Sequence, residues 1–184
     1  MEQTPCYWGG FALFIYKLYL SKNSGSSNPV GTRDLDTLIP RKISKVSTKD
    51  ISEHLQEHGF KHKHKDLQNP PTESYIKEIN GVEIEVEFLT SDNVRKDKLK
   101  NLQVGGIVAQ PLSYLELSLK TTTPFTTSSG QKGFVVSPAS WIFHKGLTFP
   151  KRKNATKKLK DFYGIWYVLN QLGQNWKPRI RTEI

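Results

Sequence analysis

The clearest pattern in the chain is an alternation of apolar and polar residues that predicts the second arm of a β-hairpin. The alternating positions are Val82, Glu83, Ile84, Glu85, Val86, Glu87 and Phe88. Asn80-Gly81 separates this arm from a strand-like segment, 74–79, and is the strongest short signal for a two-residue hairpin turn. Because side chains alternate across a strand, one face of the arm should meet the core and the other should carry three carboxylates.

Other short segments predict further strands. The segment 32–39 follows a loop rich in Ser, Asn and Gly and stops at Pro40. Segments 112–119 and 134–136 also have strand-like composition, and we expect the polar segment 121–132 between them to be a loop. Together with the hairpin, these segments predict a small sheet.

Two helices are predicted in the first half of the chain. The apolar segment 11–20 has the length of a buried helix. Ser47-Thr48-Lys49-Asp50 has the form of a capping box, and apolar residues follow it at a spacing of four. Gly59 is a suitable C′ residue, so the second helix is expected over 48–58.

Two more helices are predicted near the C-terminus. Ser137-Pro138 supplies an N-cap and an N1 proline for a helix that should run to Leu147, and 155–172 carries apolar residues at helical spacing. Three aromatic residues of these helices are expected in the core: Trp141, Phe162 and Trp166. The segment 174–184 forms a basic tail, in which Trp176 packs back on the sheet or contacts a partner.

The order of these elements is helix, strand, helix, hairpin, two strands and two helices. This order predicts an α+β fold, with a small mixed β-sheet, flanking helices and a helical C-terminal part. At 184 residues the chain is long enough for one domain with its own core, or one domain with a small helical appendage.

The charge of the chain says more about its possible partners than its length does. The net charge is +10 and the isoelectric point is about 9.6, which indicates an anionic partner unless the charge serves solubility alone. A single cysteine, Cys6, excludes an internal disulfide and suits a reducing compartment. No apolar run reaches the ~18 residues of a transmembrane helix, and the acidic Glu2 argues against a signal peptide. We therefore expect a cytoplasmic protein without a membrane partner.

Asp34 and Asp36, one residue apart in the predicted strand 32–39, carry the first candidate chemistry. Side chains at i and i+2 share one face of a strand, so these carboxylates lie close together and repel each other. Mg²⁺ is the usual solution for such a pair and is commonly shared with substrate phosphates. Gly9-Gly10, which opens the first predicted helix, lets the backbone approach a phosphate.

In this order, the motifs resemble the opening of the nucleotidyltransferase superfamily with the DNA polymerase β-like fold. Trp8-Gly9-Gly10-Phe11-Ala12-Leu13 resembles its glycine turn, and Thr32-Arg33-Asp34-Leu35-Asp36 resembles its Asp-x-Asp strand. Val86-Glu87-Phe88-Leu89-Thr90 looks like the strand with the third carboxylate, which favours Glu87 over Glu85.

Two later motifs resemble the toxin-like branch of that superfamily, which includes the nucleotidyltransferases of abortive-infection and toxin–antitoxin systems. They are Trp141-Ile142-Phe143-His144-Lys145 and Lys160-Asp161-Phe162-Tyr163. The resemblance implies that Lys145 contacts a triphosphate. It also implies that Asp161 supports the active site, and Asp161 is a candidate general base.

The resemblance implies a nucleotidyltransferase-like catalytic core over 1–136 and a C-terminal helical part with a basic tail over 137–184. The implied catalytic residues are Asp34, Asp36, Glu87, Lys145 and Asp161. The implied metal ligands are Asp34, Asp36 and Glu87. The implied nucleotide-binding residues are Gly9, Gly10, Thr32, Arg33 and Lys145.

The implied reaction uses Mg²⁺ or Mn²⁺ and moves a nucleoside monophosphate from an NTP to a hydroxyl acceptor. The acceptor is open among a tRNA end, a protein hydroxyl and a small molecule, and the positive charge favours nucleic acid. An antitoxin protein is a further open partner. One alternative is a non-catalytic relative that binds nucleic acid or a protein through its basic surface. A metal nuclease ranks last, because no lysine stands two residues after Glu85 or Glu87.

Several basic residues lie outside these motifs. His62 and His64 share a strand face in Lys61-His62-Lys63-His64-Lys65, but the flanking lysines favour a solvated or RNA-facing strip over a metal site. His144 is expected to be a packed or surface residue. The segment 151–158, which includes Arg152, either guides a polyanionic acceptor or is a solvated charge run.

Overall fold

The computed structural model describes residues 6–21, 27–42, 49–66, 70–92 and 101–172. Within them the strands are β1 (Cys6–Tyr7), β2 (Asp34–Leu38), β3 (Lys61–His64), β4 (Glu73–Ile79), β5 (Val82–Ser91), β6 (Leu102–Val104), β7 (Ile107–Leu112), β8 (Thr122–Thr126) and β9 (Lys132–Val136). The helices are α1 (Phe11–Ile15), which continues as the π-helix η1 (Tyr16–Leu20), α2 (Ile51–Glu57), α3 (Leu115–Lys120), α4 (Pro138–Thr148), the 3₁₀-helix η3 (Phe149–Lys151) and α5 (Ala155–Leu172).

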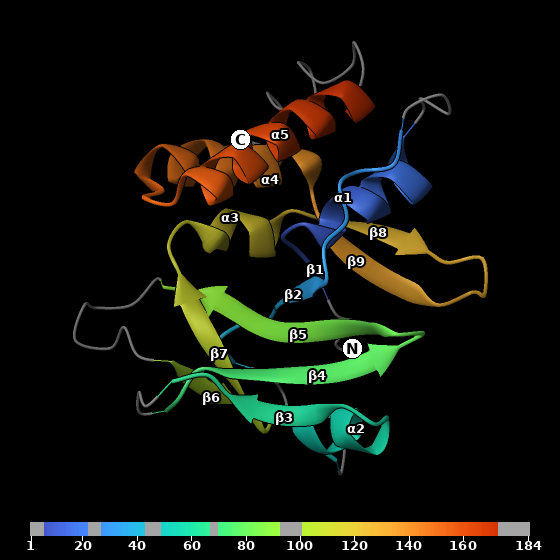
Figure 1. Ribbon diagram of the computed structural model, residues 1–184, viewed down its shortest axis with the longest axis vertical. Coiled ribbons are helices and arrows are strands. Elements are labelled where there is room, and N and C mark those ends of the chain that lie inside the picture. The colour runs from blue at the N-terminus through green and yellow to red at the C-terminus, as the bar shows by residue number, and fades with distance from the viewer. Residues whose placement is uncertain (1–5, 22–26, 43–48, 67–69, 93–100, 173–184) are drawn as a thin grey trace.

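In the described part of the chain, the strands form one nine-stranded sheet with helices around it (Figure 1). The strand order is β3-β4-β5-β2-β1-β9-β8, and β7 pairs with both β5 and β6. The sheet is mixed, since β2 and β5 are parallel while β4 and β5 are antiparallel. The predicted α+β class with a mixed sheet and flanking helices is therefore confirmed.

The predicted hairpin is the connection between β4 and β5. Asn80 and Gly81 have φ values of 52° and 75°, the pair of positive angles that a type I′ turn requires. The turn fixes the register, in which Ile79 pairs with Val82 and Tyr75 with Val86. The prediction of a hairpin at this position is confirmed.

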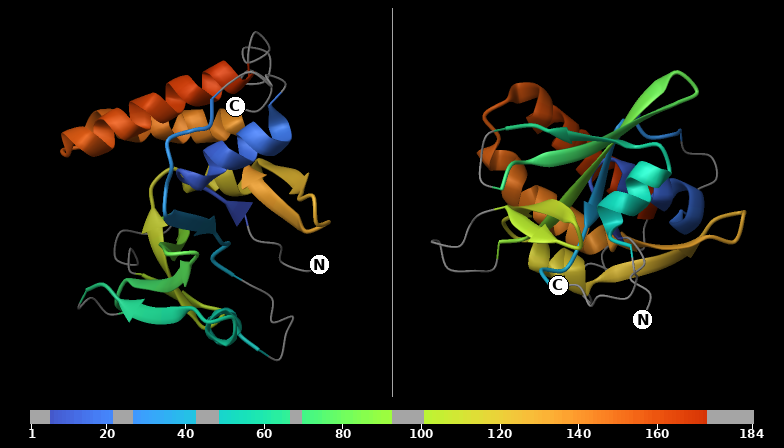
Figure 2. Two further views of the ribbon diagram at one scale, coloured as in Figure 1. Left: turned by 45° about the vertical axis from the view of Figure 1, so that its right-hand side comes forward. Right: turned by 90° about the horizontal axis from the view of Figure 1, so that it is seen from below.

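The helices α1, α4 and α5 lie together at one end of the molecule, and α2 lies beside β3 at the other end (Figures 1 and 2). The first group shares a core cluster with β1 and β9 that includes Leu13, Tyr16, Trp141 and Tyr167. A Cβ atom on Gly164 of α5 would lie 2.6 Å from Cη2 of Trp141, so this glycine permits α4 and α5 to approach closely. The C-terminal helices are thus part of the core that holds the first strand and helix.

The second helix begins later than the sequence predicts. Asp50, not Ser47, is its N-cap: Asp50 Oδ1 accepts from the backbone N of Glu53 at 2.8 Å, and Glu53 Oε2 accepts from the backbone N of Asp50 at 3.0 Å. This reciprocal pair is a complete capping box, which places the first helical residue at Ile51. Ser47 lies outside the described residues. Gly59 follows the helix with a φ of 82°, as its predicted C′ position requires.

Two predictions for 112–132 are wrong. The expected strand 112–119 is the end of β7 followed by helix α3, because Tyr114 reverses the chain at a φ of 67° and Leu115 then packs fully buried in the core. The expected loop 121–132 contains strand β8, which pairs antiparallel with β9 at the edge of the sheet. The threonines of β8 are β-branched, which suits an edge strand in spite of their polarity.

The predicted C-terminal helices are confirmed. Ser137 caps α4, with its Oγ accepting from the backbone N of Ser140 at 3.2 Å, and α5 spans the expected residues. Phe162 and Trp166 are 61% and 55% exposed, however, so their expected core positions are wrong. The buried face of α5 is set by its contact with Trp141 through Gly164, and this turns Phe162 and Trp166 outward. The basic tail 174–184, with Trp176, lies outside the described residues. Among the described residues, no helix is both long and apolar enough to cross a membrane.

Candidate active site

Parallel pairing of β2 with β5 brings carboxylates from both strands together. Asp34 is the register partner of Glu85, and Asp36 is the register partner of Glu87. Because paired residues on neighbouring strands project from the same face, these four carboxylates form one group, here named the acid cluster. The opposite face of β5 carries Val86 and Phe88 in the core, as the alternation predicts.

Within the acid cluster, Asp36 has the pKa that its surroundings shift most clearly. Burial raises the pKa of Asp36 to about 6, and the charges of Glu87 and Asp34 add to the rise. The positive charges of Lys145 and Lys160 oppose it. Asp36 is therefore electrostatically coupled both to the carboxylates of β2 and β5 and to lysines of the two C-terminal helices.

The glycine turn lies directly against Asp36. Gly9 has a φ of +62°, and a Cβ atom on it would lie 1.8 Å from Asp36 Oδ2. The backbone N of Trp8 donates to the carbonyl of Asp36 at 2.9 Å, and Nε1 of Trp141 donates to the carbonyl of Gly9 at 3.0 Å. The turn is thus fixed between the aspartate strand and α4, and Gly9 has no side chain that would displace the carboxylate.

The start of β2 is flanked by three residues of the predicted nucleotide-binding set: Gly10, Thr32 and Arg33. A Cβ atom on Gly10 would lie 3.1 Å from Cβ of Thr32. Thr32 Oγ1 accepts from the backbone N of Asp34 at 3.3 Å, and the carbonyl of Arg33 accepts from the backbone N of Glu85 at 3.0 Å. The bond from Glu85 to Arg33 begins the pairing of β2 with β5. Arg33 is exposed.

Lys145 and Asp161 form a buried ion pair between α4 and α5. Lys145 Nζ lies 2.8 Å from Asp161 Oδ1, and Arg152 Nε lies 2.8 Å from Asp161 Oδ2. Burial lowers the pKa of Lys145, although Asp161 acts against the fall. Burial alone would raise the pKa of Asp161, but Lys145 and Arg152 outweigh it and hold the pKa below its usual range. Nζ of Lys145 also lies 4.7 Å from the centre of the Trp8 ring, next to the glycine turn.

His144 is buried, which settles the choice between a packed and a surface residue that the sequence left open. Burial lowers its pKa to about 4, and the charge of Lys145 contributes to the fall. Its Nε2–H donates to the carbonyl of Ser113 at 3.0 Å, and its ring meets the Trp8 ring edge-on at 4.8 Å. Nδ1 has no hydrogen-bond partner among the described residues.

Lys65 is a member of the site that sequence reasoning missed. Its Nζ lies 2.7 Å from Glu85 Oε1 and also forms a short hydrogen bond with Glu87 Oε1. Burial alone would raise the pKa of Glu85, but the hydrogen bond and charge of Lys65 bring it below its usual range. Side chains alternate along Lys61–Lys65, so the odd-numbered lysines lie on one face and the two histidines on the other. This alternation was the signal in the sequence that could have placed Lys65 on a different face from the histidines.

The structure therefore brings the residues singled out by the sequence into one region. Asp34, Asp36 and Glu87 share a face, the glycine turn contacts Asp36, and Lys145 acts on Asp36 from α4. Glu85 lies on the same face beside Asp34, as Glu87 lies beside Asp36, so the register does not separate the two glutamates.

Comparison with known proteins identifies the family. A family model described as Nucleotidyltransferase matches residues 4–183, almost the whole chain. Among solved structures, the chain is similar to the crystal structure of an antigenic nucleotidyltransferase-like protein from Paracoccidioides brasiliensis. The two are 17% identical with a TM-score of 0.49, and the comparison covers 97% of this chain and 76% of that one. No curated protein sequence matches the chain.

Proposed function

Because the chain belongs to the nucleotidyltransferase family, we propose that it transfers a nucleoside monophosphate from an NTP to a hydroxyl acceptor at the acid cluster. The observation that supports this most strongly is the parallel pairing of Asp36 with Glu87, with Asp34 on the same face. The glycine turn packs against the Asp36 carboxylate at the same point.

The acid cluster fits a hard divalent cation. Its donors are carboxylate oxygens, which suit Mg²⁺ and Mn²⁺. Burial raises the pKa of Asp36, and the charges of Glu87 and Asp34 add to the rise. The Lys65 ammonium lies against Glu85 and Glu87, so this face is a place where positive charge is stabilised. Asp34, Asp36 and Glu87 are the proposed ligands. When bound, the metal ion supplies positive charge to the triphosphate and acidifies the acceptor hydroxyl.

The proposed roles of the other residues follow from their positions. Gly9, which packs against Asp36, and Gly10, which packs against Thr32, are assigned to phosphate binding, together with Thr32 and Arg33 just before β2. Lys145 offsets negative charge near Asp36, and Asp161 holds Lys145 in place. Asp161 is a poor proton acceptor, because two cations keep its pKa low, so we assign it a positioning role and not that of a general base.

The acceptor and the partners are proposed from the charge and from the resemblance of α4 and α5 to the toxin-like branch. The net charge of +10 and the exposed basic residues of 151–158 support RNA, such as a tRNA end, as the acceptor. The toxin-like resemblance extends the proposal to an antitoxin partner and a cytoplasmic setting. Co-purification with the product of the neighbouring gene tests the partner.

The test is transfer of label from each of the four NTPs, in the presence of Mg²⁺, to total RNA or to a mixed protein acceptor. We expect label in the RNA fraction, and none with Asp36→Asn or with EDTA. Label in protein alone would keep nucleotidyl transfer and overturn the RNA acceptor. No label in any fraction, with no NTP binding by calorimetry, would overturn the proposed activity.

A non-catalytic relative is the second candidate, and the contact of Lys65 with Glu87 is the observation that favours it. A lysine held on the third carboxylate occupies an oxygen that the metal ion needs. Such a protein would bind RNA through its basic surface but would not bind NTP with Mg²⁺. Calorimetric titration of the four NTPs with Mg²⁺ separates the two candidates.

A further inference from the structure

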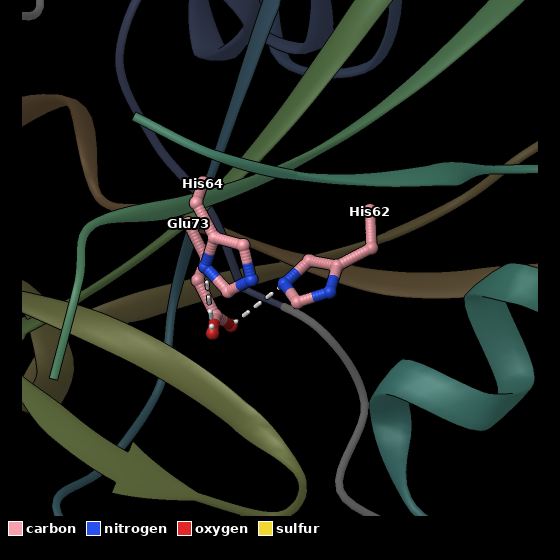
Figure 3. Close-up of side chains that lie close together, drawn as sticks. All are labelled: His62, His64 and Glu73. Atoms are coloured by element: carbon pink, nitrogen blue, oxygen red, sulfur yellow. Dashed lines mark ion pairs between the residues drawn. The ribbon is translucent and has the colours of Figure 1, made fainter. Parts of the chain in front are cut away.

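A second cluster of possible metal ligands lies on the other face of the sheet. His62 and His64 occupy one face of β3, and Glu73 of β4 is the register partner of His64. One ligand atom from each side chain lies within 4.8 Å of the others. Figure 3 shows both rings directed toward the carboxylate of Glu73.

The cluster is separate from the acid cluster. His62 pairs with Tyr75, and Tyr75 pairs with Val86, whose side chain lies in the core and not on the face of Glu87. The lysines beside the histidines alternate onto the opposite face, where Lys65 contacts Glu85. The flanking lysines therefore do not crowd the histidine face, and the reason that the sequence offered against a metal site does not hold.

The surroundings of Glu73 favour a cation between the three side chains. Glu73 is 9% exposed, and a carboxylate so deeply buried is costly without a compensating positive charge. Among the described residues, its ion-pair partners are the two imidazole rings, with Nε2 of His62 at 3.1 Å from Oε2 and Nδ1 of His64 at 3.7 Å from Oε1. The His62 ring is held by stacking on Tyr75 at 5.0 Å.

We propose that His62, His64 and Glu73 bind a Zn²⁺ ion that joins the edge strand β3 to β4. Two imidazole nitrogens and one carboxylate oxygen form a donor set typical of zinc, and a water completes the tetrahedron on the exposed side of His64. In a tetrahedral zinc site with bonds of about 2.0–2.2 Å, ligand atoms lie roughly 3.3–3.6 Å apart. Nε2 of His62 lies 3.1 Å from Oε2 of Glu73 and Nδ1 of His64 lies 3.7 Å from Oε1, and one ligand atom from each side chain lies within 4.8 Å of the others. Side-chain rotations that bring both nitrogens and one carboxylate oxygen to the tetrahedral spacing complete the site.

The test is Zn²⁺ binding by the full chain after removal of metal with EDTA, measured by equilibrium dialysis and by the absorption spectrum of Co²⁺ as a substitute. We expect one tetrahedral site, and at least about tenfold weaker binding in Glu73→Gln and in His62→Asn with His64→Asn. The matched control is His54→Asn with His58→Asn, which removes the two histidines of the α2 region whose rings lie 4.3 Å apart. That variant should bind Zn²⁺ like the unmodified protein.

A wild-type chain that binds no Zn²⁺, or equal losses in the control, would overturn the proposal. So would loss of the site in Asp34→Asn with Asp36→Asn alone, because the ion would then belong to the acid cluster. If the double histidine variant does not fold, Glu73→Gln and the Zn²⁺-dependent NMR shifts of the His62 and His64 ring nitrogens decide the matter. None of these measurements requires nucleotidyl transfer, so their failure is distinguishable from failure of the proposed activity.

Discussion

Gly9 and Asp36 are fitted together so closely that a Cβ atom at position 9 would lie 1.8 Å from Oδ2 of the aspartate. The fit depends on two properties of glycine, the missing side chain and the φ of +62°. The bond from the backbone N of Trp8 to the carbonyl of Asp36 ties the same two segments. The glycine turn therefore determines where the Asp36 carboxylate lies, and this makes position 9 part of the proposed active site.

Gly9→Ala should destabilise the protein and abolish nucleotidyl transfer. The new methyl group displaces the Asp36 carboxylate and the positive φ becomes strained, which together should cost about 1–3 kcal/mol of unfolding free energy. Urea denaturation and the labelled-NTP assay measure the two effects. Gly31→Ala is the matched control, because a Cβ atom there meets nothing within 4 Å. Equal behaviour of the two variants would contradict the role of the turn.

Asp36→Asn should raise stability in the absence of metal while it removes activity. The pKa of Asp36 is raised to about 6 in the folded protein, so the ionised carboxylate opposes folding above that pH. Relative to its ordinary value of 3.8, this corresponds to at most about 3 kcal/mol at neutral pH. Thermal unfolding at pH 7 in EDTA measures the gain.

Glu83→Gln is the control for that comparison, since Glu83 lies on β5 four residues before Glu87 and is exposed. It should change neither stability nor transfer appreciably. A melting temperature that falls in Asp36→Asn would mean that the carboxylate supports the fold, and the assignment to a metal site would then be wrong.

Lys65→Gln should strengthen Mg²⁺ binding at the acid cluster. The Lys65 ammonium now neutralises Glu85 and Glu87, and its removal leaves those carboxylates free for the metal ion. We expect a several-fold lower Mg²⁺ concentration at half-saturation, and a loss of stability of about 1 kcal/mol or less without metal, because the pair is partly exposed. Calorimetric Mg²⁺ titration measures the first effect. Lys61→Gln is the control, and an unchanged titration in Lys65→Gln would refute the competition.

The sequence predicted correctly those parts of the fold that depend on residues close together in the chain. The hairpin at Asn80-Gly81 and the cap at Ser137-Pro138 each depend on neighbouring residues and appear as expected. The helix α3 was missed because the positive φ of Tyr114, which ends β7, has no glycine to signal it. The buried face of α5 was misassigned because Gly164, and not an apolar residue, makes the closest contact with Trp141.

The same distinction holds for the site. The Asp-x-Asp spacing and the glutamate alternation were visible, but the parallel register that sets Asp36 beside Glu87 depends on strands far apart in the chain. Lys65 was missed for this reason, since only the sheet brings the end of β3 to Glu85. The ion pair of Arg152 with Asp161 was hidden in a basic segment in which every residue, Arg152 included, is exposed.

Asp161→Asn should destabilise the protein more than removal of the whole ion pair. The single change leaves Lys145 buried without its counter-charge, a situation that costs about 3–5 kcal/mol. Lys145→Met combined with Asp161→Leu removes both charges and should recover most of that loss. Transfer should nevertheless stay about 10²–10³-fold below wild type, because the positive charge near Asp36 is gone.

Chemical denaturation and the labelled-NTP assay on the three proteins test this prediction. Recovery of activity together with stability in the double variant would show that Lys145 serves the fold alone. A double variant as unstable as Asp161→Asn would contradict the explanation by an unpaired buried charge.

His144→Gln should remove part of the acid sensitivity of the fold. The pKa of His144 falls from its ordinary 6.5 to about 4 on folding, chiefly through burial, with Lys145 and Arg152 adding to the fall and Asp161 opposing it. Between these two values the unfolded chain binds a proton that the folded chain does not, so stability declines as the pH falls from about 6.5 toward 4. The full loss is about 3 kcal/mol, since one pKa unit corresponds to about 1.4 kcal/mol.

Other groups also titrate in that range, and Asp36 acts in the opposite direction, so the difference between wild type and variant is the quantity to measure. Glutamine can still donate to the carbonyl of Ser113, the acceptor of the histidine Nε2–H. The unfolding free energies of wild type and His144→Gln should be measured at pH 7, 6, 5 and 4. As the pH falls, the advantage of wild type over His144→Gln should shrink or reverse. His54→Gln, at an exposed position of α2, should follow wild type. A constant difference across the range would mean that His144 does not titrate with a lowered pKa, and its burial beside Trp8 and Lys145 would then need another explanation.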